Sequence, residues 1–515
     1  MTKLAVPIAA KTIEQATGQI NAAINSGADI IELRIDYLDN PTVDSTLELL
    51  DIAREALSTL PVIVTCRSPQ QGGASNTPDD LRVDILVAAI KADANFIDCE
   101  YDTFTKIKYQ EKIRLALSNS TRTRLILSAH SFKGPFPDLA GIYRHITTTY
   151  SAAIPKLVYT ANHINDCFAA LDLLSRTSDD RIVFCMGAAG LITRILAKKL
   201  NSFLTFACLD SDSATAPGQI TVAELRDIYR FYYINAQTEL FGVIGSPIAH
   251  SLSPAVHNAC FAKAKMNRLY LPILLEGGRA EFDTFIDRLL SRRAIGFKGF
   301  SVTIPHKENA LACVQRKAGK VEPLAEIIGA ANTLIFGPDD RTSAYNTDCR
   351  AAIDAIKTSL KTLEGIDAAV IGAGGVARSL VAGLRGEGAK VTIYNRTVKK
   401  AQRLADEFEC EYASLDDLKT LAAKLVVNCT SLGMFPDIET TPLPAEYLKK
   451  GMTVFDTVYN PPQTRLLKDA KKKRLKTVSG SEMFINQAAA QFKLFTKQEP
   501  DTALMRTILS HCLSA

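Results

Sequence analysis

Two residues in the first half of the chain, Lys156 and His130, have the types and spacing needed for a dehydration. Lys156 begins the apolar run Lys-Leu-Val-Tyr, and His130 ends the preceding run within Leu-Ser-Ala-His-Ser. We expect few other charges around Lys156, so that burial and nearby arginines favour its neutral amine, which can form an imine with a ketone. His130 could then remove a proton next to the imine and return it to a leaving hydroxyl. The pair predicts loss of water from a β-hydroxy ketone.

Further charged side chains lie at the ends of other apolar runs in this half. Glu32 and Arg34 alternate within one run, so the period of two along a strand places them on the same face. Arg67 ends the next run, and Arg194 follows Gly-Leu-Ile-Thr. Several guanidinium groups around one opening suit a polyhydroxylated ligand that carries a carboxylate.

A lysine and an aspartate in the second half, Lys307 and Asp348, are suited to carbonyl reduction. Lys307 ends Thr-Ile-Pro-His-Lys, and Asp348 ends Asn-Thr-Asp. An ammonium group can donate a proton as a hydride arrives, while a carboxylate orients it and keeps it charged. Upstream, Ser251 and Ser253 in Ser-Leu-Ser-Pro present two hydroxyl groups that could hold a carboxylate.

A glycine-rich loop in the second half predicts a dinucleotide site. Gly-Ala-Gly-Gly-Val-Ala follows an apolar run and precedes a helical segment, so the backbone can approach a pyrophosphate at a helix N-terminus. The next predicted strand ends in Asn-Arg-Thr instead of an acidic residue, and Arg396 with Lys400 suits a 2'-phosphate, which favours NADP(H) over NAD(H). The expected cofactor-binding residues are Gly372, Ala373, Gly374, Gly375, Val376, Ala377, Asn395, Arg396, Thr397, Lys400 and Thr430.

Each motif has a simpler explanation when it is taken alone. A lone histidine is more often a surface or core residue than a catalyst, and a strand lysine could extend its amine to water. Ser-Leu-Ser-Pro is most often a helix N-terminus, and Asn-Thr-Asp is most often a turn. A glycine loop could serve only to pack a helix on a strand. The joint occurrence of all of them in one order favours function.

The elements that must position the first set of residues are short apolar runs alternating with helix-length segments. They predict eight strands, at Lys3–Ile8, Ile30–Ile35, Val62–Cys66, Phe96–Cys99, Arg124–Ser128, Lys156–Tyr159, Ile182–Cys185 and Phe203–Ala207. Eight strand–helix repeats predict an α/β fold of the (β/α)8 TIM barrel type, whose polar strand ends meet at one mouth. A helix is expected over Val222–Tyr233.

The stretch Asn235–Thr238 separates this barrel from a region that is built differently. Phe241–Gly245 opens a second α/β unit, and Ala368–Ile371 leads into the glycine loop of a third. We expect the barrel at 1–234, followed by these two further α/β units.

Composition supports an enzyme of several domains. A chain of 515 residues exceeds what one hydrophobic core usually serves. No run approaches the roughly 18 apolar residues of a membrane span. The net charge of +5 is mild, and no aromatic residues interleave with the basic run Lys471–Arg474, so nucleic acid is not expected as a partner. The eleven cysteines lack a Cys-x-x-Cys pair and no signal peptide is evident, which favours a cytoplasmic protein. The seven histidines form no close pair, so no metal is expected.

The first set of residues, with the loop Thr215–Gln219, resembles type I 3-dehydroquinate dehydratase over about residues 1–230. The resemblance implies a Schiff base on Lys156 and acid–base catalysis by His130 during conversion of 3-dehydroquinate to 3-dehydroshikimate. It also implies a wall at Met186 and substrate contacts from Glu32, Arg34, Arg67, Arg194, Thr215 and Gln219.

One position departs from that family. Gln71 stands where the family usually has a glutamate that partners the histidine. A neutral amide can orient an imidazole but stabilises an imidazolium less. Either His130 titrates at lower pH, or another carboxylate, Asp98 or Glu100, takes the place of the glutamate.

The second set resembles shikimate dehydrogenase over about residues 240–515, including the stretches Asn428–Met434 and Met483–Gln487. This resemblance implies reduction of 3-dehydroshikimate by NADPH. It places around shikimate the residues Ser251, Ser253, Thr303, Lys307, Asn332, Asp348, Tyr459 and Gln487. It also implies a substrate-binding α/β domain at 239–347, a Rossmann-type NADP-binding domain at 348–485, and C-terminal helices at 486–515 that pack back on the substrate-binding domain.

Together the two resemblances predict a bifunctional enzyme for consecutive steps of aromatic precursor synthesis, with small-molecule substrates and no membrane partner. Two alternatives stay open. Gln71 could mark a weakened first site, leaving the barrel as a scaffold beside an active dehydrogenase. The chain could instead be a regulatory or assembly protein that uses inherited pockets as sensors. The oligomeric state does not follow from the sequence.

Overall fold

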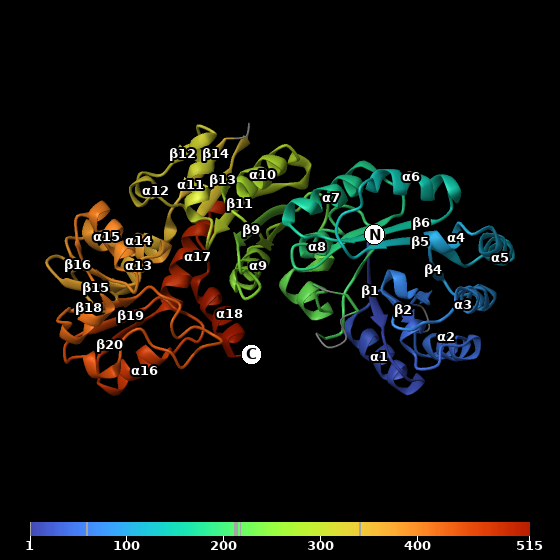
Figure 1. The fold of residues 1–515 in the computed structure, drawn as a ribbon, viewed down its shortest axis with the longest axis horizontal. Coiled ribbons are helices and arrows are strands. Elements are labelled where there is room, and N and C mark those ends of the chain that lie inside the picture. The colour runs from blue at the N-terminus through green and yellow to red at the C-terminus, as the bar shows by residue number, and fades with distance from the viewer. Residues whose placement is uncertain (1, 58–59, 211–214, 217, 339–340, 515) are drawn as a thin grey trace. The chain divides into compact units, whose positions relative to one another are not determined.

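The structure is a computed structural model that describes residues 2–57, 60–210, 215–216, 218–338 and 341–514. It divides into two compact units, Met1–Thr238 with Ile273–Glu276, and Glu239–Pro272 with Gly277–Ala515. Figure 1 shows the first unit mainly in blue and green and the second from yellow-green to red. Within the described ranges, we find no helix whose length and apolar character would suit a membrane crossing.

The first unit is an eight-stranded parallel barrel in the described residues, with the strand order β7-β6-β5-β4-β3-β2-β1-β8. Its strands are β1 (Lys3–Ile8), β2 (Ile30–Arg34), β3 (Val62–Thr65), β4 (Phe96–Glu100), β5 (Arg124–Ser131), β6 (Ile154–Thr160), β7 (Ile182–Met186) and β8 (Leu204–Phe206). The two ends of the sheet meet just before β7 and β8. There the Phe203 amide donates a hydrogen bond to the Arg181 carbonyl at 2.7 Å. The barrel prediction is confirmed.

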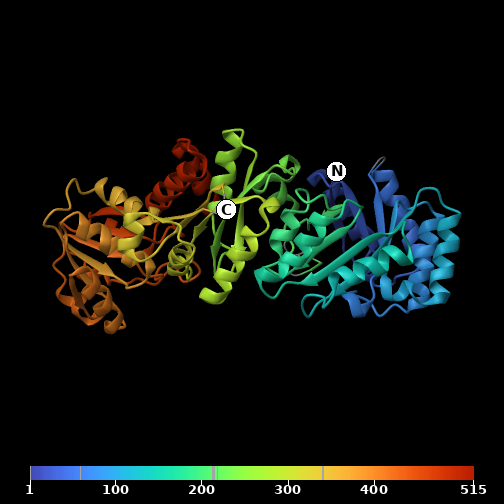
Figure 2. The same cartoon turned by 90° about the horizontal axis from the view of Figure 1, so that it is seen from above.

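Helices follow the strands and lie around the outside of the barrel, as Figures 1 and 2 show. They are α1 (Ile13–Ser26), α2 (Val43–Leu57), α3 (Asp79–Lys91), α4 (Tyr101–Phe104), α5 (Ile107–Ser118), α6 (Leu139–Thr149), α7 (Cys167–Arg176) and α8 (Leu191–Ile195).

The barrel interior changes from apolar to charged along the strands. An apolar layer includes Ile30, Ile63, Phe96, Ile126 and Ile154, all fully or almost fully buried. Side chains two residues later point to the same face of a strand, and here they are Glu32, Thr65, Asp98, Ser128 and Lys156. The period of two therefore delivers polar groups to the C-terminal end of the barrel, where sites form in this fold.

One predicted element of this unit is wrong. The helix expected over Val222–Tyr233 is interrupted: a π-helix covers Glu224–Ile228, and a 3-10 helix covers Phe231–Tyr233. Arg230 between them has a φ of 53°, in the left-handed region, which ends the first helix. The turn places the ring of Phe231, which is 0% exposed, in the core.

The second unit begins with a mixed six-stranded sheet, ordered β10-β9-β11-β13-β14-β12. Its strands are β9 (Glu239–Gly245), β10 (Arg268–Leu274), β11 (Phe297–Val302), β12 (Lys320–Val321), β13 (Thr333–Phe336) and β14 (Thr342–Tyr345). The helices among them are α9 (Ser253–Lys263), α10 (Arg279–Leu290), α11 (Lys307–Arg316) and α12 (Pro323–Ile328). Strand β13 pairs antiparallel with both β11 and β14.

A second sheet of this unit is parallel and has the Rossmann order β17-β16-β15-β18-β19-β20. Its strands are β15 (Asp367–Ile371), β16 (Lys390–Tyr394), β17 (Glu411–Ala413), β18 (Leu425–Asn428), β19 (Thr453–Asp456) and β20 (Lys476–Ser479). Its helices are α13 (Thr347–Lys357), α14 (Gly375–Gly386), α15 (Val398–Phe408) and α16 (Arg465–Lys472). The strand order reverses between β15 and β18, where ligands bind in such sheets.

Consecutive side chains of the central strand β15 point to opposite faces of the sheet and pack in two different hydrophobic cores. Val370 packs with Leu380 of α14 on one face of the sheet, whereas Ile371 packs with Leu466 of α16 on the other. Figure 1 shows α14 and α16 on opposite sides of the sheet. The helices therefore cover both faces and leave the carboxyl ends of the strands for a ligand.

Two helices end the chain, α17 (Gly480–Thr496) and α18 (Thr502–Ser514). Gln491 of α17 accepts a hydrogen bond from Ser301 at 2.7 Å and donates to the carbonyl of Asn332 at 3.3 Å, so α17 lies against the mixed sheet. The expected boundaries at 348 and 486 both fall inside helices, α13 and α17 respectively.

Candidate active sites

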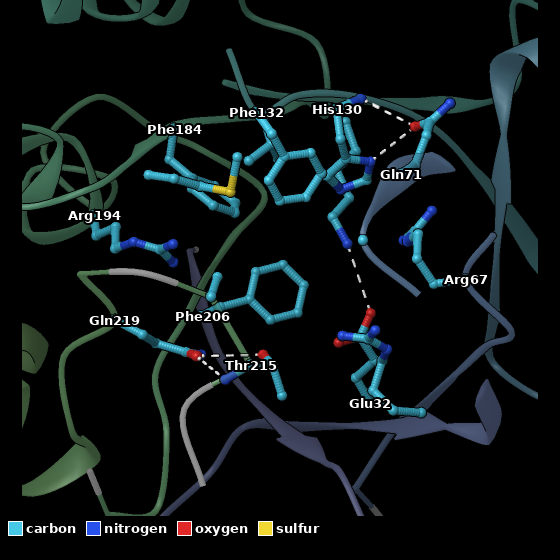
Figure 3. Close-up of a pocket in the computed structure, with 16 residues that line it drawn as sticks. Glu32, Arg67, Gln71, His130, Phe132, Phe184, Arg194, Phe206, Thr215 and Gln219 are labelled. Atoms are coloured by element: carbon cyan, nitrogen blue, oxygen red, sulfur yellow. Dashed lines mark hydrogen bonds and ion pairs between the residues drawn. The ribbon is translucent and has the colours of Figure 1, made fainter. Parts of the chain in front are cut away.

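One pocket at the C-terminal end of the barrel strands brings the predicted residues of the first half together (Figure 3). The empty space between its lining residues, counted out to open solvent, is about 500 Å³. The predicted residues that line it are Glu32, Arg34, Arg67, His130, Lys156, Met186, Arg194, Thr215 and Gln219. Pro217, part of the loop motif, lies outside the described residues.

Lys156 lies inside this pocket and is 4% exposed. Its Nζ is 2.8 Å from Asp98 Oδ2 and 3.5 Å from Glu32 Oε1, and it lies 4.4 Å from the centroid of the Phe206 ring. The expectation that few other charges surround this lysine is therefore wrong. Strands β2 and β4, which are not adjacent to β6 in the sheet, place these two carboxylates within reach of the amine across the barrel interior.

Arg67 organises the carboxylates beneath the lysine. Its guanidinium group lies 2.7 Å from Asp98 and 3.0 Å from Glu100, and it donates to Ser128 at 2.6 Å. Burial alone would raise the pKa of the Asp98 carboxyl, but Arg67 and Lys156 hold that pKa well below its usual range. Asp98 is thus an anion over the ordinary pH range, committed to these two cations.

The histidine partner is Gln71, at the end of a 3-10 helix, Pro69–Gln71. Its Oε1 accepts the backbone N–H of His130 at 3.0 Å, which fixes the orientation of the amide. The same oxygen lies 3.0 Å from Nδ1 of His130, so Nδ1 carries the proton and Nε2 is left as the base.

The contacts of Asp98 and Glu100 distinguish the two explanations for Gln71, a substitute carboxylate and a histidine that titrates at lower pH. Among the described residues, Asp98 and Glu100 bond to Arg67, and neither forms a hydrogen bond with the His130 ring. Burial, together with Arg67 and Lys156, lowers the pKa of His130 well below its usual value. The geometry therefore favours a histidine that titrates at lower pH over a substitute carboxylate.

We expect the change Gln71→Glu to move the acid limb of the dehydration pH profile to higher pH. The lowered pKa of His130 keeps its neutral, basic form present at low pH. A carboxylate 3.0 Å from Nδ1 would stabilise the imidazolium and raise the pKa of His130, so kcat/KM would fall off at a higher pH than in the parent. The measurement is kcat/KM between about pH 5 and 9. Gln71→Met is the neutral control, and an unmoved limb in Gln71→Glu would contradict the assignment.

Arg194 is a buried cation without a counter-ion in the described part of the chain. The residue is 1% exposed, its guanidinium carbon lies 4.3 Å from the centroid of the Phe184 ring, and its Nε and Nη2 have no hydrogen-bond partner among the described residues. Burial lowers its pKa to about 10, which still leaves it charged at neutral pH. Gln219, which lines the same pocket (Figure 3), accepts from the Thr215 amide through its Oε1 at 2.8 Å. This end of the pocket is suited to an anion.

The second unit brings Lys307 and Asp348 together. Lys307 Nζ lies 2.5 Å from Asp348 Oδ2, and the two residues are 8% and 7% exposed. Lys307 begins α11, and Asp348 lies in the first turn of α13. Asn346 caps α13 by accepting from the Cys349 amide at 3.2 Å, so the Asn-Thr-Asp motif is a helix start that aims the aspartate at the lysine.

Asn332 connects the segments that carry this pair. Its Oδ1 accepts from the Thr347 amide at 2.9 Å, and its Nδ2 donates to the Thr347 hydroxyl at 2.9 Å. The preceding residue, Ala331, donates its amide to the Lys307 carbonyl at 2.9 Å. Asn332 is thus fixed beside the lysine–aspartate pair.

The other predicted substrate residues come from four segments of the same unit. Ser251 precedes α9, Ser253 begins α9, and Thr303 follows β11 with its amide bonded to the Ile244 carbonyl at 2.9 Å. Tyr459 follows β19, its ring lies 4.9 Å from that of Phe484 in α17, and Gln487 lies one turn later in that helix.

The glycine loop has the properties of a dinucleotide cradle. Gly372 has a φ of 115°, and a Cβ there would lie 3.1 Å from the Cys429 carbonyl, so glycine is required. A Cβ at Gly374, the N-cap of α14, would meet nothing within 4 Å, which leaves open space at the helix N-terminus. A Cβ at Gly375 would lie 3.7 Å from Lys307 Cδ, so the loop adjoins the lysine.

The remaining predicted cofactor residues surround this loop. Ala373 and Val376 pack partly against the sheet core, and the fully buried Ala377 lets α14 approach it closely. Thr430 is the next neighbour of Gly372, since a Cβ there would lie 3.2 Å from Thr430 Cγ2.

The end of β16 is suited to an additional phosphate. Thr397 is the N-cap of α15, and Asn395 donates its side-chain amide to the Thr397 carbonyl at 2.9 Å. Arg396 and Lys400 are both exposed beside this helix start. A helix N-terminus with two cations fits the 2'-phosphate that distinguishes NADP(H) from NAD(H).

Four family profiles match consecutive parts of the chain. They are described as Type I 3-dehydroquinase, residues 4–236; Shikimate dehydrogenase substrate binding domain, residues 243–334; Shikimate / quinate 5-dehydrogenase, residues 354–435; and Shikimate 5'-dehydrogenase C-terminal domain, residues 480–509.

A similar full-length protein is the bifunctional 3-dehydroquinate dehydratase/shikimate dehydrogenase, chloroplastic, of Arabidopsis thaliana. It is 36% identical over 96% of this chain and 82% of its own length. This chain belongs to that bifunctional family. The shikimate dehydrogenase (NADP(+)) of Methanosarcina barkeri is 42% identical over 53% of this chain and 99% of its own length. A crystal structure of a shikimate dehydrogenase in complex with NADP+ covers 55% of this chain and 98% of its own, with 34% identity and a TM-score of 0.50.

Several pocket residues of the dehydratase half were missed from sequence. Phe132, Phe184 and Phe206 line the pocket, and Phe206 contacts the lysine amine. Asp98 was considered only as a partner for the histidine, although it bonds to Lys156. The signal was available in the strand period, because Asp98 follows the apolar Phe96 by two residues, as Lys156 follows Ile154.

Proposed function

We propose that the chain catalyses two consecutive reactions of the shikimate pathway. The barrel dehydrates 3-dehydroquinate to 3-dehydroshikimate through a Schiff base, and the second unit reduces 3-dehydroshikimate to shikimate with NADPH. The observation that carries this proposal is the single barrel pocket in which a buried lysine, a histidine base and an unpaired arginine converge.

In the barrel, Lys156 is the nucleophile toward the substrate ketone. Its ammonium must first lose a proton, and Glu32, whose Oε1 lies 3.5 Å away, is placed to accept it, while the anionic Asp98 at 2.8 Å keeps the amine oriented. His130 acts through Nε2 as the base beside the imine and returns the proton to the leaving hydroxyl. Arg194 supplies the cation for the substrate carboxylate, which would give its free N–H groups partners. Glu32, Arg34, Arg67, Thr215 and Gln219 provide the remaining substrate contacts.

In the second unit, Lys307 donates a proton to the carbonyl oxygen during reduction and accepts it during oxidation. Asp348, whose Oδ2 lies 2.5 Å from Nζ, orients the ammonium. NADPH, when bound, supplies the hydride. Gly372–Ala377 and Thr430 would hold its pyrophosphate side, and Asn395–Thr397 with Lys400 its 2'-phosphate. Ser251, Ser253, Thr303, Asn332, Tyr459 and Gln487 are the proposed shikimate contacts.

The test is incubation of the full-length protein with 3-dehydroquinate and NADPH, followed by product analysis. The proposed function requires shikimate and oxidised cofactor. A barrel that serves only as a scaffold would leave 3-dehydroquinate unchanged while added 3-dehydroshikimate is still reduced. A sensor without catalysis would leave both compounds and NADPH unchanged.

Replacing Arg396 with alanine should weaken NADP+ more than NAD+. A charge-assisted contact to the 2'-phosphate would be lost, and at an exposed site we expect KM for NADP+ to rise about tenfold. KM for NAD+ should stay within about twofold, because NAD+ lacks that phosphate. Steady-state shikimate oxidation with each cofactor measures the change. Lys399→Ala, one residue from Lys400 on α15, is the control. An equal rise for both cofactors would place Arg396 elsewhere.

The domain limits and the location of the protein stay predictions. We propose functional divisions at 1–234, 239–347, 348–485 and 486–515, with the last helices packing on the substrate-binding domain. We also propose a cytoplasmic location and small-molecule partners alone. The relative from Arabidopsis thaliana is described as chloroplastic.

A further inference from the structure

Asp456, at the end of β19, is a buried carboxylate to which the proposed reactions give no role. It is 0% exposed. In the described part of the chain it forms no ion pair with a cation, and its three recorded hydrogen bonds come from neutral donors. Burial raises its pKa to about 6. Burying a carboxylate without a cation costs free energy, so its role is to be sought in the groups that it binds.

One oxygen of Asp456 connects two loops. Its Oδ1 accepts from Asn428 Nδ2 at 2.9 Å and from the Val458 amide at 3.0 Å. Asn428 ends β18, and Val458 lies in the loop after β19. The carboxylate therefore bridges two loops at the carboxyl edge of the parallel sheet.

The first loop leads to the cofactor side. Asn428 turns its Oδ1 toward Thr430, accepting from the Thr430 amide at 2.9 Å and from the hydroxyl at 2.7 Å. Thr430 in turn adjoins Gly372, the first residue of the glycine loop. Asn428 Nδ2 donates to Asp456 at 2.9 Å and, more weakly, to the Leu432 carbonyl at 3.2 Å, so the bond to Asp456 is the shorter of the two that fix which way the amide faces, and so fix Thr430.

The second loop leads to the substrate side. Tyr459 follows directly after Val458, whose amide Asp456 holds, and its ring packs on Phe484. The other carboxylate oxygen, Oδ2, accepts from the Thr464 hydroxyl at 2.6 Å, and Thr464 is the N-cap of α16. The loop from Val458 to Thr464 is thus held at both ends by one side chain.

We propose that Asp456 is a positioning residue of the dehydrogenase site, which fixes Thr430 on the cofactor side and Tyr459 on the substrate side through one carboxylate. The inference rests on the proposed function, in which Thr430 and Tyr459 contact NADP+ and shikimate. A purely structural aspartate would instead cap α16 and affect only the stability of the domain.

The experiment compares Asp456→Ala and the nearly isosteric Asp456→Asn with the parent, all as full-length protein. We expect Asp456→Ala to raise KM for NADP+ at least about tenfold and KM for shikimate several-fold, while kcat at saturation stays within about threefold. Asp456→Asn keeps one acceptor oxygen and should show a smaller rise. The matched control is Asp469→Asn, which removes another buried carboxylate of the same domain, paired with Arg465 at 3.1 Å, and should leave both KM values unchanged.

A double-mutant cycle with Thr430→Val tests whether Asp456 acts through that residue. The effects of Asp456→Ala and Thr430→Val on KM for NADP+ should be clearly less than additive, because both remove the same placement. Additive effects, unchanged KM values, or a loss of kcat alone would overturn the inference. Absence of NADP+-dependent shikimate oxidation in the parent would overturn the proposed function instead, so the two failures are distinguishable.

Discussion

The change Lys156→Met should abolish dehydration of 3-dehydroquinate and leave shikimate oxidation at the parent rate. Methionine keeps the length of the side chain but cannot form an imine, so we expect kcat for dehydration to fall by at least about 10⁴-fold. The fold should persist, because Asp98 keeps Arg67 at 2.7 Å and Ser128 at 2.6 Å and is not left as an unpaired buried charge.

Two measurements on the same sample check this result. Borohydride reduction in the presence of 3-dehydroquinate should add the mass of the reduced substrate to the parent and not to the Lys156→Met protein. Lys133→Met, which removes a lysine from the loop after β5 and not from the pocket, is the control and should retain the adduct. An adduct that survives in the Lys156→Met protein would show that another amine is the nucleophile.

The period of two along the strands explains how much of the barrel site could be predicted. It placed Glu32 and Arg34 on one face, and both line the pocket. The same period turns Asp98 and Lys156 into the barrel interior, but sequence alone does not say which interior side chains meet. The register aligns Glu100, not Asp98, with Ser128 and Lys156, and the ion pair at 2.8 Å shows that Asp98 is the carboxylate that reaches the amine.

Local sequence was least informative where tertiary contacts decide the backbone. The helix expected over Val222–Tyr233 has suitable residues throughout, yet the burial of Phe231 is achieved with a left-handed Arg230 that breaks it. Sequence also could not predict that Nε and Nη2 of Arg194 find no partner among the described residues, because this depends on which groups from other strands reach them. By contrast, the glycine loop could be predicted because its geometry is set within a few consecutive residues.

The change Lys307→Ala should reduce shikimate oxidation strongly and spare dehydration. The alanine variant lacks the group that transfers the proton during hydride transfer, and we expect kcat to fall by about 10²- to 10⁴-fold. The measurement is the steady-state rate of NADP+ reduction with shikimate, next to the dehydration rate of the same preparation. Lys317→Ala, at the other end of α11 and paired with Asp287, is the control and should retain both activities.

A second variant separates the chemical role of Lys307 from its structural one. Lys307→Ala leaves Asp348, 7% exposed, without the cation that lies 2.5 Å away, so some stability is lost with the proton donor. Adding Asp348→Asn removes the unpaired charge and should restore stability toward that of the parent without restoring oxidation. Recovery of oxidation in the double variant would mean that the lysine acts only as a counter-ion. Equal loss of dehydration and oxidation in Lys307→Ala would mean that the two sites are not independent. We expect independence because neither Lys307 nor Asp348 lines the barrel pocket.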